Sequence, residues 1–354
     1  MRQKVIHVGI GVFGKRWCRD FLKQNQDDGT IEVVALVDVD PKALEFGRTA
    51  LGLPESRCYT DPRKAFAENQ CDFCTVVVPP KHHEAIIDLA IEYGVDILCE
   101  KPIADTMEAS VRIARKVREA KRKMAVTMSH RFDQDKTTLR QIVRSGSLGK
   151  VNTVSCRFAG AMRRHLEWSS AFRHTMQDPL LIEGAIHHLD LMADFAGADC
   201  ETLYASTWRP SWAEYAGDTD AVVTMVFENG VRGTYEGTCA HAVGLNFFYN
   251  EYFRIDCENG SVVMNHRDIE VFTRQPFWRQ QTREGQGQKI QLLVQPKWIN
   301  NLLVEAFAKW REGGPALETE VQLNLQSSAL VFGAIESKRT GAPVRVQDFI
   351  RSFG

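Results

Sequence analysis

The sequence lacks any apolar run near the ~20 residues that a membrane-spanning helix needs. It also lacks a charge imbalance, because 44 Lys and Arg residues offset 45 Asp and Glu residues to leave a formal net charge of −1. That balance gives no electrostatic reason to expect nucleic acid or an anionic membrane as a partner. No signal-peptide pattern precedes the first strand-like run. We therefore expect a cytoplasmic protein whose partners include neither nucleic acid nor membrane.

Cysteine gives no sign of a disulfide framework or a metal centre. The nine cysteines are an odd number, and several lie in apolar, strand-like runs, which is typical of buried free thiols in a reducing compartment. Cys71 and Cys74 form one C-x-x-C pair, but it stands alone within such a run. We expect no metal site. At 354 residues, with 44% hydrophobic and 25% charged residues, the chain is long enough for two globular domains.

Three glycines near the N-terminus form the first functional motif. Gly9, Gly11 and Gly14 follow a short apolar run and open a helix-like segment. In this G-x-G-x-x-G pattern the first glycine allows a tight turn, the second lets the backbone approach a pyrophosphate and the third lets helix and strand pack closely. The next apolar run, residues 31–37, ends at Asp38, where a carboxylate would meet ribose hydroxyls. The pattern predicts a nucleotide site; the alternative is a strand–turn–helix whose glycines serve packing alone.

Strand-like and helix-like segments alternate through residues 1–129, which predicts a doubly wound parallel sheet of the Rossmann type. Ligands of such sheets gather at the carboxyl ends of the strands. Besides the glycine motif and Asp38, those ends carry the Pro-Pro pair at 79–80 and the run Glu100-Lys101-Pro102. On position alone, Lys101 is either a surface residue or a donor directed into the cleft.

A second domain is expected over residues 130–354. Several strand-like runs lie there, and Asn-Gly pairs at 229–230 and 259–260 are hairpin signals, so we predict an α+β domain with a largely antiparallel open sheet. Helices are expected for only one face of that sheet. An uncovered face with apolar and aromatic residues would need a partner, which predicts a homodimer or homotetramer. The residues expected on that face include Tyr235, Phe253 and Val271.

An acidic residue and two histidines form the second chemical cluster, in the run from Glu183 to Asp190. In a helix expected over residues 178–196, Glu183 and His187 are four residues apart, share a face and can pair. A carboxylate that holds a histidine is a common way to build a general base. The alternative is a structural pair with no part in chemistry. His188 points to another side of this helix and is expected to pack or to support the site.

Taken together, these motifs resemble the glucose–fructose oxidoreductase/inositol dehydrogenase (Gfo/Idh/MocA) family of NAD(P)-dependent oxidoreductases. The resemblance covers essentially the whole chain and implies a Rossmann domain followed by an open mixed sheet, in proteins that commonly form dimers or tetramers. The motifs that carry it are the glycine motif at 9–14, the segment 79–102, His130-Arg131-Phe132 with Gly146-x-x-Gly149, and the acid-x-x-x-His-x-x-Asp pattern at 183–190.

The resemblance implies a role for individual residues. Lys101 corresponds to the catalytic lysine, His187 to the acid/base histidine and Glu183 to the acid that orients this histidine. The family usually has Asp where this chain has Glu183, so the reach of the side chain and the substrate pocket are expected to differ. The residues expected to bind the cofactor are Gly9, Gly11, Val12, Phe13, Gly14, Asp38, Pro79, His83, Glu100 and Lys101.

An arginine-rich loop over residues 159–177 matches no fixed family motif, and substrate specificity is expected there. We predict an NAD-dependent oxidoreductase, with NAD rather than NADP, that moves hydride between nicotinamide and a secondary hydroxyl of a sugar, inositol or related polyol. The alternatives are a sugar oxidoreductase that holds NADP tightly and a non-catalytic dinucleotide-dependent sensor on the same fold. Intact Lys101 and His187 favour an enzyme. The residues expected to contact substrate are Arg163, Arg164, His165, Trp168, Arg173 and His188.

Overall fold

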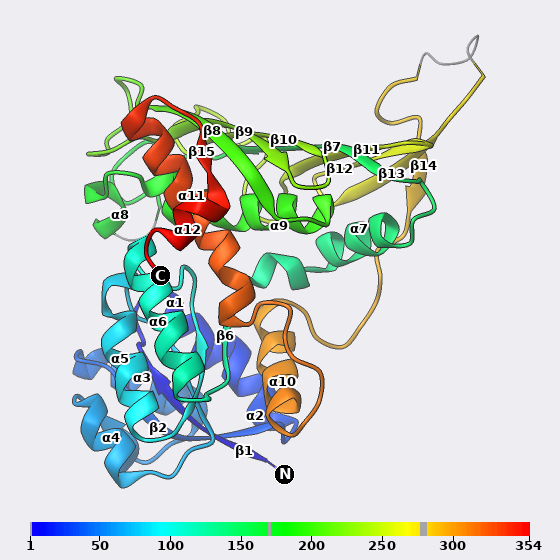
Figure 1. The fold of residues 1–354 in the computed structure, drawn as a ribbon. Coiled ribbons are helices and arrows are strands. Elements are labelled where there is room, and N and C mark those ends of the chain that lie inside the picture. Colours follow the sequence, from blue (N-terminus) through cyan, green and yellow to red (C-terminus); the bar gives the residue numbers. More distant parts are fainter. Residues whose placement is uncertain (1, 169–170, 277–281) are drawn as a thin grey trace. The chain divides into compact units, whose positions relative to one another are not determined.

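The computed structural model describes residues 2–168, 171–276 and 282–354 (Figure 1). Within the described ranges, no helix combines the length and the apolar character that crossing a membrane requires.

The chain divides into two compact units. The first unit comprises Met1–Ser129, Lys297–Leu325 and Phe353–Gly354, and the second comprises His130–Pro296 and Gln326–Ser352.

A parallel sheet forms the centre of the first unit. Its strands are β1 Gln3–Val8, β2 Ile31–Val37, β3 Cys58–Tyr59, β4 Phe73–Val76, β5 Asp96–Cys99 and β6 Met124–Val126. They stand in the order β3-β2-β1-β4-β5-β6, and every neighbouring pair is parallel. The prediction of a Rossmann-type doubly wound sheet is confirmed.

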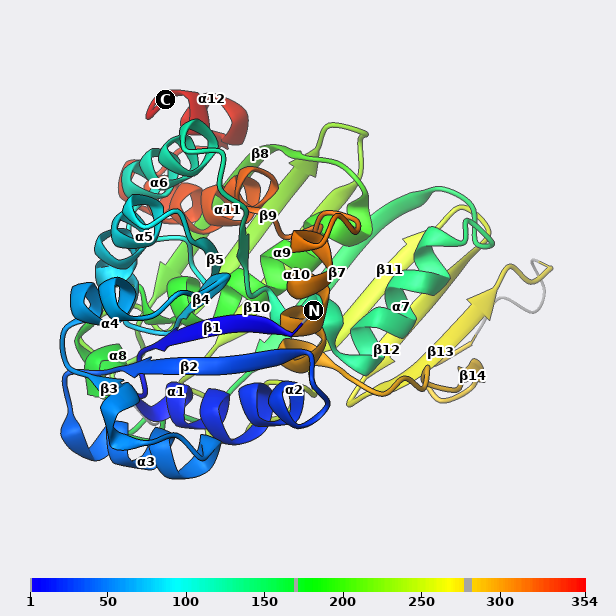
Figure 2. The same ribbon diagram turned by 90° about the horizontal axis from the view of Figure 1, so that it is seen from below.

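Helices cover both faces of this sheet. They are α1 Val12–Arg16, the π-helical η1 Trp17–Leu22, α2 Lys23–Asp27, α3 Pro41–Leu51, η2 Glu55–Arg57, α4 Pro62–Glu68, η3 Pro80–His82, α5 His83–Glu92 and α6 Met107–Glu119. On one face α1, η1, α2 and α3 contact one another, and on the other face α4, α5 and α6 do so (Figure 2). Helix α3 shows how sequence sets the bounds, because Asp40 caps its first turn and Gly52, with φ of 69°, ends it.

A later segment returns to the first unit. Helix α10, Ile299–Arg311, packs its Phe307 ring against Phe73 of β4, with ring centroids 5.1 Å apart. At the end of α10, Arg311 Nε donates to Asp96 of β5 at 2.8 Å. The sequence analysis assigned this segment to the second domain, but its apolar face packs within the first unit.

A mixed sheet of nine described strands forms the centre of the second unit. The strands are β7 Val151–Ala159, β8 Cys200–Trp208, β9 Asp220–Phe227, β10 Arg232–Thr238, β11 Tyr252–Cys257, β12 Gly260–Asn265, β13 Asp268–Thr273, β14 Gln288–Ile290 and β15 Val344–Arg345. Their order is β14-β13-β12-β11-β7-β10-β9-β8-β15. Among the described pairs, β7 and β10 are parallel and the others antiparallel, so the predicted α+β class is confirmed.

The helices of the second unit are the η4 turn Ser129–Phe132, α7 Gln134–Arg144, α8 Ala171–Thr175, the π-helical η5 Leu180–Ala185, α9 Ile186–Ala196, α11 Val321–Thr340 and α12 Val346–Arg351. Two of these elements cross a boundary between the units. The turn η4 begins at Ser129, just before the boundary, and α11 begins at Val321, before the boundary at Leu325. Helix α9 packs on β7 and β10, and α7 packs on β12 and β13. Figures 1 and 2 show both helices along the same face of the sheet.

That covered face of the sheet is apolar. The strand registers align one row of buried side chains across it: Ala205, Val223, Tyr235, Cys156, Phe253, Met264 and Ile269. Tyr235 and Phe253 are fully buried, and Val271 shares the face of Ile269 two residues earlier. The expectation that Tyr235, Phe253 and Val271 lie on the uncovered face is therefore wrong, because strand alternation directs them to the helices.

The opposite face of the sheet is largely polar. One aligned row on it consists of Ser206, Val222, Glu236, Arg157, Tyr252 and Asn265. Two aromatic residues of β8 also lie on this face, Tyr204 with 42% and Trp208 with 46% of its surface exposed. The alternation of apolar and polar residues is typical of an antiparallel sheet with helices on one side only.

The helix expected over residues 178–196 differs in its first turn. Residues 180–185 form the π-helical η5, and the chain becomes α-helical at Ile186. A π-helix closes i→i+5 hydrogen bonds, so a spacing of four residues does not place side chains as it does in an α-helix. The shared face that the spacing predicted for Glu183 and His187 therefore does not follow.

Candidate functional site

The glycine motif forms a turn in which two positions have no room for a Cβ atom. Gly9 has φ of 99°, and a Cβ atom built on it would lie 2.3 Å from Val77 O. A Cβ atom on Gly14 would lie 2.2 Å from Gly9 O. A larger residue at position 9 would clash with the segment that follows β4, and one at position 14 would push α1 away from the turn after β1. Packing within the protein accounts for both glycines.

Gly11 has a different explanation. It is the N-cap of α1, and a Cβ atom built on it would meet nothing within 4 Å. The neighbouring Val12 and Phe13 are 63% and 38% exposed. The protein itself leaves this space open, and the absence of a side chain would let an external group approach the first N–H groups of the helix. This cradle fits the pyrophosphate of a dinucleotide.

Asp38 follows β2 beside the same turn. Its carboxylate accepts hydrogen bonds from Ile10 N–H at 2.5 Å and from Asp40 N–H at 2.9 Å. These bonds fix the carboxylate and use only part of its acceptor capacity, since an ionised carboxylate offers about four lone-pair sites. The remaining acceptors suit the hydroxyls of an adenosine ribose. Together with Gly11, Asp38 therefore fits NAD.

The run Glu100-Lys101-Pro102 follows β5 at the same end of the strands. Glu100 is buried and accepts from Trp17 Nε1 at 2.9 Å and from Lys101 N–H at 3.3 Å. Burial raises the pKa of Glu100, although Lys101 opposes the shift. The glutamate fixes the backbone of this loop through its bond from Lys101 N–H, and the lysine is half-buried.

His83 joins two loops at this end of the sheet. It is fully buried; its Nε2 lies 2.9 Å from Val78 O, and its Nδ1 lies 3.1 Å from Pro102 O. The segment between β4 and η3, with Pro79 as the N-cap of η3, is thereby tied to the lysine loop. This arrangement supports an indirect part for His83 in cofactor binding, through the position of the two loops.

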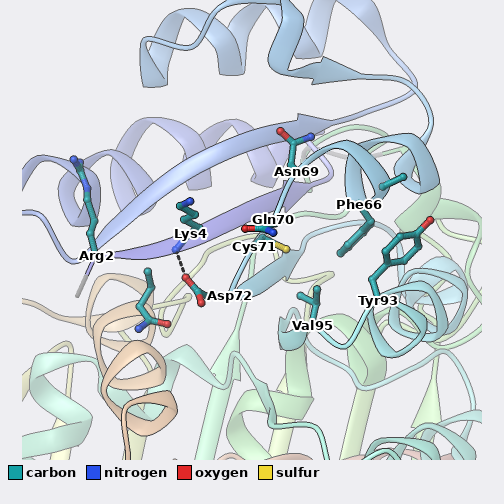
Figure 3. A pocket seen from close by; sticks show the side chains of 11 residues that line it. Arg2, Lys4, Phe66, Asn69, Gln70, Cys71, Asp72, Tyr93 and Val95 are labelled. Carbon is teal, nitrogen blue, oxygen red and sulfur yellow. Dashed lines mark hydrogen bonds between the residues drawn. The ribbon is translucent and has the colours of Figure 1, made fainter.

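The pocket in Figure 3 lies at the other end of the same strands. Its walls come from the start of β1 and from the segments that precede β4 and β5. Lys4 N–H donates to Asp72 at 2.7 Å, and the rings of Phe66 and Tyr93 stack with centroids 5.9 Å apart. Ligands of open α/β sheets bind at the carboxyl ends of the strands. We therefore assign this pocket no part in dinucleotide binding.

Three buried histidines gather in the second unit. His130 comes from η4, and His187 and His188 come from the first turn of α9. The rings of His130 and His187 stack with centroids 4.0 Å apart and planes 8° apart. His187 keeps 7% of its surface exposed, whereas His188 keeps none. Of the two neighbours on α9, His187 is thus the one with access to a ligand.

A fully buried ion pair supports this cluster. Lys136 Nζ of α7 lies 2.6 Å from Glu251 Oε2, and neither residue has exposed surface. The other carboxylate oxygen, Oε1, accepts from Tyr249 N–H at 3.0 Å and lies 3.3 Å from His130 Nδ1 and 3.6 Å from His188 Nε2. Burial alone would raise the pKa of Glu251, but Lys136 and the two histidines hold it well below its usual range. Glu251 is therefore a fixed negative charge.

His188 packs within this cluster. Its Nδ1 lies 3.3 Å from the Tyr235 hydroxyl, and its ring centroid is 4.9 Å from that of Phe158. Burial lowers the pKa of His188, and Glu251 opposes the shift. The expectation of packing agrees with this position, whereas the expectation that His188 contacts substrate does not, because the side chain has no exposed surface.

Glu183 pairs with a residue of the arginine-rich loop. Arg173 Nε donates to Glu183 Oε2 at 2.9 Å, and Arg173 Nη2 lies 2.8 Å from the same oxygen. The guanidinium also lies 5.3 Å from the ring centroid of Trp168. This ion pair holds the Glu183 carboxylate, and the role of Glu183 in orienting His187 stays a prediction.

The other predicted substrate residues lie in the same loop. Arg164 and His165 are exposed, Arg163 is half-buried and Trp168 is buried. The ring of His165 lies 4.8 Å from that of His174, which in turn stacks on Tyr215. The structure thus brings Trp168, Arg173 and Glu183 together and leaves the remaining basic residues on the loop surface.

The last residue of the acid–histidine pattern has a structural role. Asp190 is buried and accepts from Arg131 Nε at 2.6 Å and from its terminal nitrogen at 2.8 Å, and the Ser327 hydroxyl donates to the same carboxylate. Arg131 also pairs with Asp194 at 3.3 Å. These bonds fix η4 on α9, and so they fix His130 against His187.

The sequence analysis missed the importance of Lys136, Glu251 and, as a part of the site, His130. The pairing of Lys136 with Glu251 spans 115 residues, so no local spacing could reveal it. One signal was available: the face of α7 that is buried carries Asp135, Lys136 and Arg140, charges that need partners when buried.

Comparison with known proteins gives two matches along the chain. The family described as an oxidoreductase family with an NAD-binding Rossmann fold matches residues 3–128. The GFO/IDH/MocA C-terminal domain matches residues 137–263. The first match covers the cradle of the first unit, and the second covers His187, His188 and Glu251 but not His130 or Lys136.

Individual relatives extend this likeness. The chain is 57% identical to the uncharacterized protein y4oX of Sinorhizobium fredii, over 100% of this chain and 98% of the relative. It is 28% identical to inositol 2-dehydrogenase of Corynebacterium glutamicum over 64% of this chain and 65% of that enzyme. Its fold matches a solved oxidoreductase from Agrobacterium radiobacter, in complex with NAD+, L-tartaric acid and magnesium, with a TM-score of 0.81, 20% identity and coverage of 99% of this chain and 100% of that one.

Proposed function

Because this chain belongs to the GFO/IDH/MocA family of oxidoreductases with an NAD-binding Rossmann domain, we propose that it is a dehydrogenase of a sugar, inositol or related polyol. The reaction would transfer hydride between a secondary hydroxyl-bearing carbon and nicotinamide, in either direction. The observation that carries the proposal is His187, a histidine with a small exposed surface within a buried, charged cluster. A protein that only sensed a dinucleotide would have no need of such proton chemistry.

NAD, when bound, takes up or gives back the hydride. Gly11 and the first N–H groups of α1 would hold its pyrophosphate, and Asp38 would hold its adenosine ribose. Lys101, anchored through the backbone bond to Glu100, would contact the nicotinamide ribose and the reacting hydroxyl. These residues would orient the cofactor through backbone N–H groups, a fixed carboxylate and the lysine side chain.

Proton transfer falls to side chains of this chain. We assign His187 as the group that takes the hydroxyl proton during oxidation and returns it during reduction. Lys101 would stabilise the negative charge that develops on the oxygen. Glu183 would support His187, while its ion pair with Arg173 holds the carboxylate in place.

Substrate contacts are proposed for the arginine-rich loop. Trp168 could present an aromatic face to a sugar ring, and Arg173 lies over that face within the pair with Glu183. Arg163, Arg164 and His165 add donors for hydroxyl or anionic groups. A likeness to inositol 2-dehydrogenase makes inositols the first compounds to test.

The proposal is tested by mixing the protein with NAD and a panel of inositols, aldoses and sugar alcohols while nicotinamide absorbance is followed. We expect reduction of NAD with at least one polyol, and loss of this signal in Lys101→Met and His187→Ala. Tight binding of a dinucleotide without turnover on any member of the panel, in either direction, would favour the sensor instead. Cofactor that stays bound through turnover would favour the enzyme that holds its dinucleotide tightly.

A further inference from the structure

We propose that Glu251 and His130 are positioning residues that stabilise the protonated ring of His187 during turnover. The inference rests on the proposed function in one respect, that His187 is the acid/base of the reaction. Neither Glu251 nor His130 is placed to touch substrate in this scheme. The charge of Glu251 acts on His187 through the ring of His130.

The first support is the stacking of two imidazole rings. His130 and His187 lie face to face, with centroids 4.0 Å apart and an angle of 8° between their planes. Both are buried, His130 with 4% and His187 with 7% of its surface exposed. A cation above the face of an aromatic ring is attracted to it, most strongly where water is excluded. Protonated His187 would be such a cation, and His130 would be the ring beneath it.

The second support is the contact of His130 with a fixed negative charge. Its Nδ1 lies 3.3 Å from Glu251 Oε1, so a proton on Nδ1 would face the carboxylate. A neutral imidazole that faces a carboxylate in this way is polarised, with more electron density on the ring. That density favours a cation on the opposite side of the ring, where His187 lies.

The third support is that the two oxygens of the Glu251 carboxylate have different partners. Lys136 holds Oε2 at 2.6 Å, whereas Oε1 faces the histidines and accepts from Tyr249 N–H. The pKa of Lys136 is raised despite burial, because Glu251, Asp135 and Asp133 surround it. Lys136 and Glu251 therefore keep their charges across the range in which a histidine titrates. The field that His187 experiences from this pair is constant.

Other ionisable groups around the two rings come from several elements. They are Asp133, Asp135 and Lys136 at the start of α7, His188 on α9, Tyr235 on β10, and Tyr249 and Glu251 before β11. Of these, His188 is the informative comparison. Glu251 Oε1 lies 3.6 Å from His188 Nε2 and 3.3 Å from His130 Nδ1, so both histidines face the same oxygen. The ring that stacks on His187 is that of His130.

Two histidine nitrogens and one carboxylate oxygen lie within 4.8 Å of one another here, a spacing that a divalent metal could bridge. The Lys136 ammonium argues against a metal, because it lies 2.6 Å from the same carboxylate and would repel a dication. We therefore assign the cluster to proton chemistry. Dialysis against EDTA is a control for this assignment.

The test compares His130→Phe with His188→Phe. Both variants keep an aromatic ring and both remove one contact with Glu251, but only the first removes the polarised ring beneath His187. The measurement is the pH profile of NAD-dependent polyol oxidation, together with an NMR titration of the His187 ring identified by its loss in His187→Ala. The titration needs no turnover, so it reads the positioning effect even if the proposed function fails. Glu251→Gln, which keeps an acceptor and removes the charge, is the second variant if His130→Phe does not fold.

We expect the ionisation of His187 to move to lower pH in His130→Phe, by at most about one unit, because phenylalanine keeps the aromatic face but not its polarisation by Glu251, and to stay in place in His188→Phe. Glu251→Gln should move it in the same direction. Equal shifts in the two phenylalanine variants, no shift in His130→Phe, or a shift to higher pH would overturn the proposal. A shift caused by EDTA dialysis of the unmodified protein would overturn it in favour of a metal site. A normal titration of His187 without any turnover would instead refute the proposed function alone.

Discussion

His130 and His187 stack ring on ring, with centroids 4.0 Å apart, although 57 positions of sequence separate them. The bidentate bond between Arg131 and Asp190 fixes the two elements that carry these rings. Behind His130 lies Glu251, which Lys136 holds as an anion. The candidate acid/base is therefore part of a buried assembly, and its chemistry should respond to residues that never touch substrate.

The cofactor preference follows from Asp38. Its carboxylate would accept ribose hydroxyls but repel the 2′-phosphate of NADP, and Val39 beside it is 86% exposed and offers no positive charge. We predict higher kcat/KM with NAD than with NADP, and a shift toward NADP in the double variant Asp38→Ser, Val39→Arg. The measurement is steady-state kinetics with both cofactors. Equal efficiency of the unmodified protein with the two would contradict this role of Asp38.

Lys101 should affect turnover more than cofactor affinity. If it stabilises the charge on the reacting oxygen, Lys101→Met should lower kcat on the order of 100-fold or more. The Kd of NAD should change far less, because the pyrophosphate cradle and Asp38 are separate from it. Isothermal titration of NAD and single-turnover kinetics on the same variant separate the two effects. A loss of activity that lost NAD affinity explains completely would make Lys101 a binding residue only.

Lys136 should be essential to the stability of the second unit. Lys136→Met leaves Glu251, Asp133 and Asp135 without their shared buried cation, which should cost about 3–5 kcal/mol. Urea unfolding measures the loss. Lys64→Met is the matched control, because Lys64 is exposed and pairs only at 3.8 Å with Glu68, and it should change stability by less than about 0.5 kcal/mol.

The effect of Lys136 should also depend on pH. The pKa of Glu251 is lowered in the folded protein, so its stabilising contribution is present above its ordinary pKa of 4.5 and is lost as pH falls through the folded value. Without the cation, the buried carboxylates would favour protonation instead. The difference in unfolding free energy between the unmodified protein and Lys136→Met should therefore be largest at neutral pH. It should shrink as the pH falls through the raised pKa of the carboxylates in the variant and then through the lowered pKa of Glu251 in the unmodified protein. A difference independent of pH would indicate lost packing rather than a lost ion pair.

We also predict a homodimer or homotetramer that uses the uncovered face of the second sheet. The exposed rings of Tyr204 and Trp208 lie on that face among polar rows. Tyr204→Glu with Trp208→Glu should weaken the assembly, whereas Leu323→Glu, at a 62% exposed position of α11 outside the sheet, should not. Light scattering at micromolar concentration is the measurement. A monomeric unmodified protein would refute the prediction.

Local chemistry made much of the first unit predictable. The glycine spacing, the apolar run that ends at Asp38 and the proline and glycine signals of α3 each act over a few residues, and the structure has the predicted parallel sheet. The segment of α10 was assigned to the wrong unit, because nothing local distinguishes an apolar helix that packs on one sheet from an apolar helix that packs on another. Strand β14 has the polar and short sequence Gln-Lys-Ile, so no local pattern predicts it.

The candidate site of the second unit was only half predictable. His187 follows from the motif, but the π-helical turn before it changes the spacing on which its pairing with Glu183 depended. Tyr235 and Phe253 were placed on the wrong face because the register of a sheet cannot be read from one strand. The pairing of Glu251 with Lys136, and its contact with His130, are products of tertiary structure alone.

The account depends most on His187, and one measurement tests it most directly: the rate of NAD reduction by a polyol substrate across the pH range, in the unmodified protein and in His187→Ala. Oxidation needs a neutral imidazole, so the unmodified rate should rise with pH through a single ionisation. In His187→Ala the rate should fall on the order of 100-fold and the ionisation should disappear from the profile. A variant that keeps both the rate and the ionisation of the unmodified protein would contradict the assignment of His187 as the acid/base.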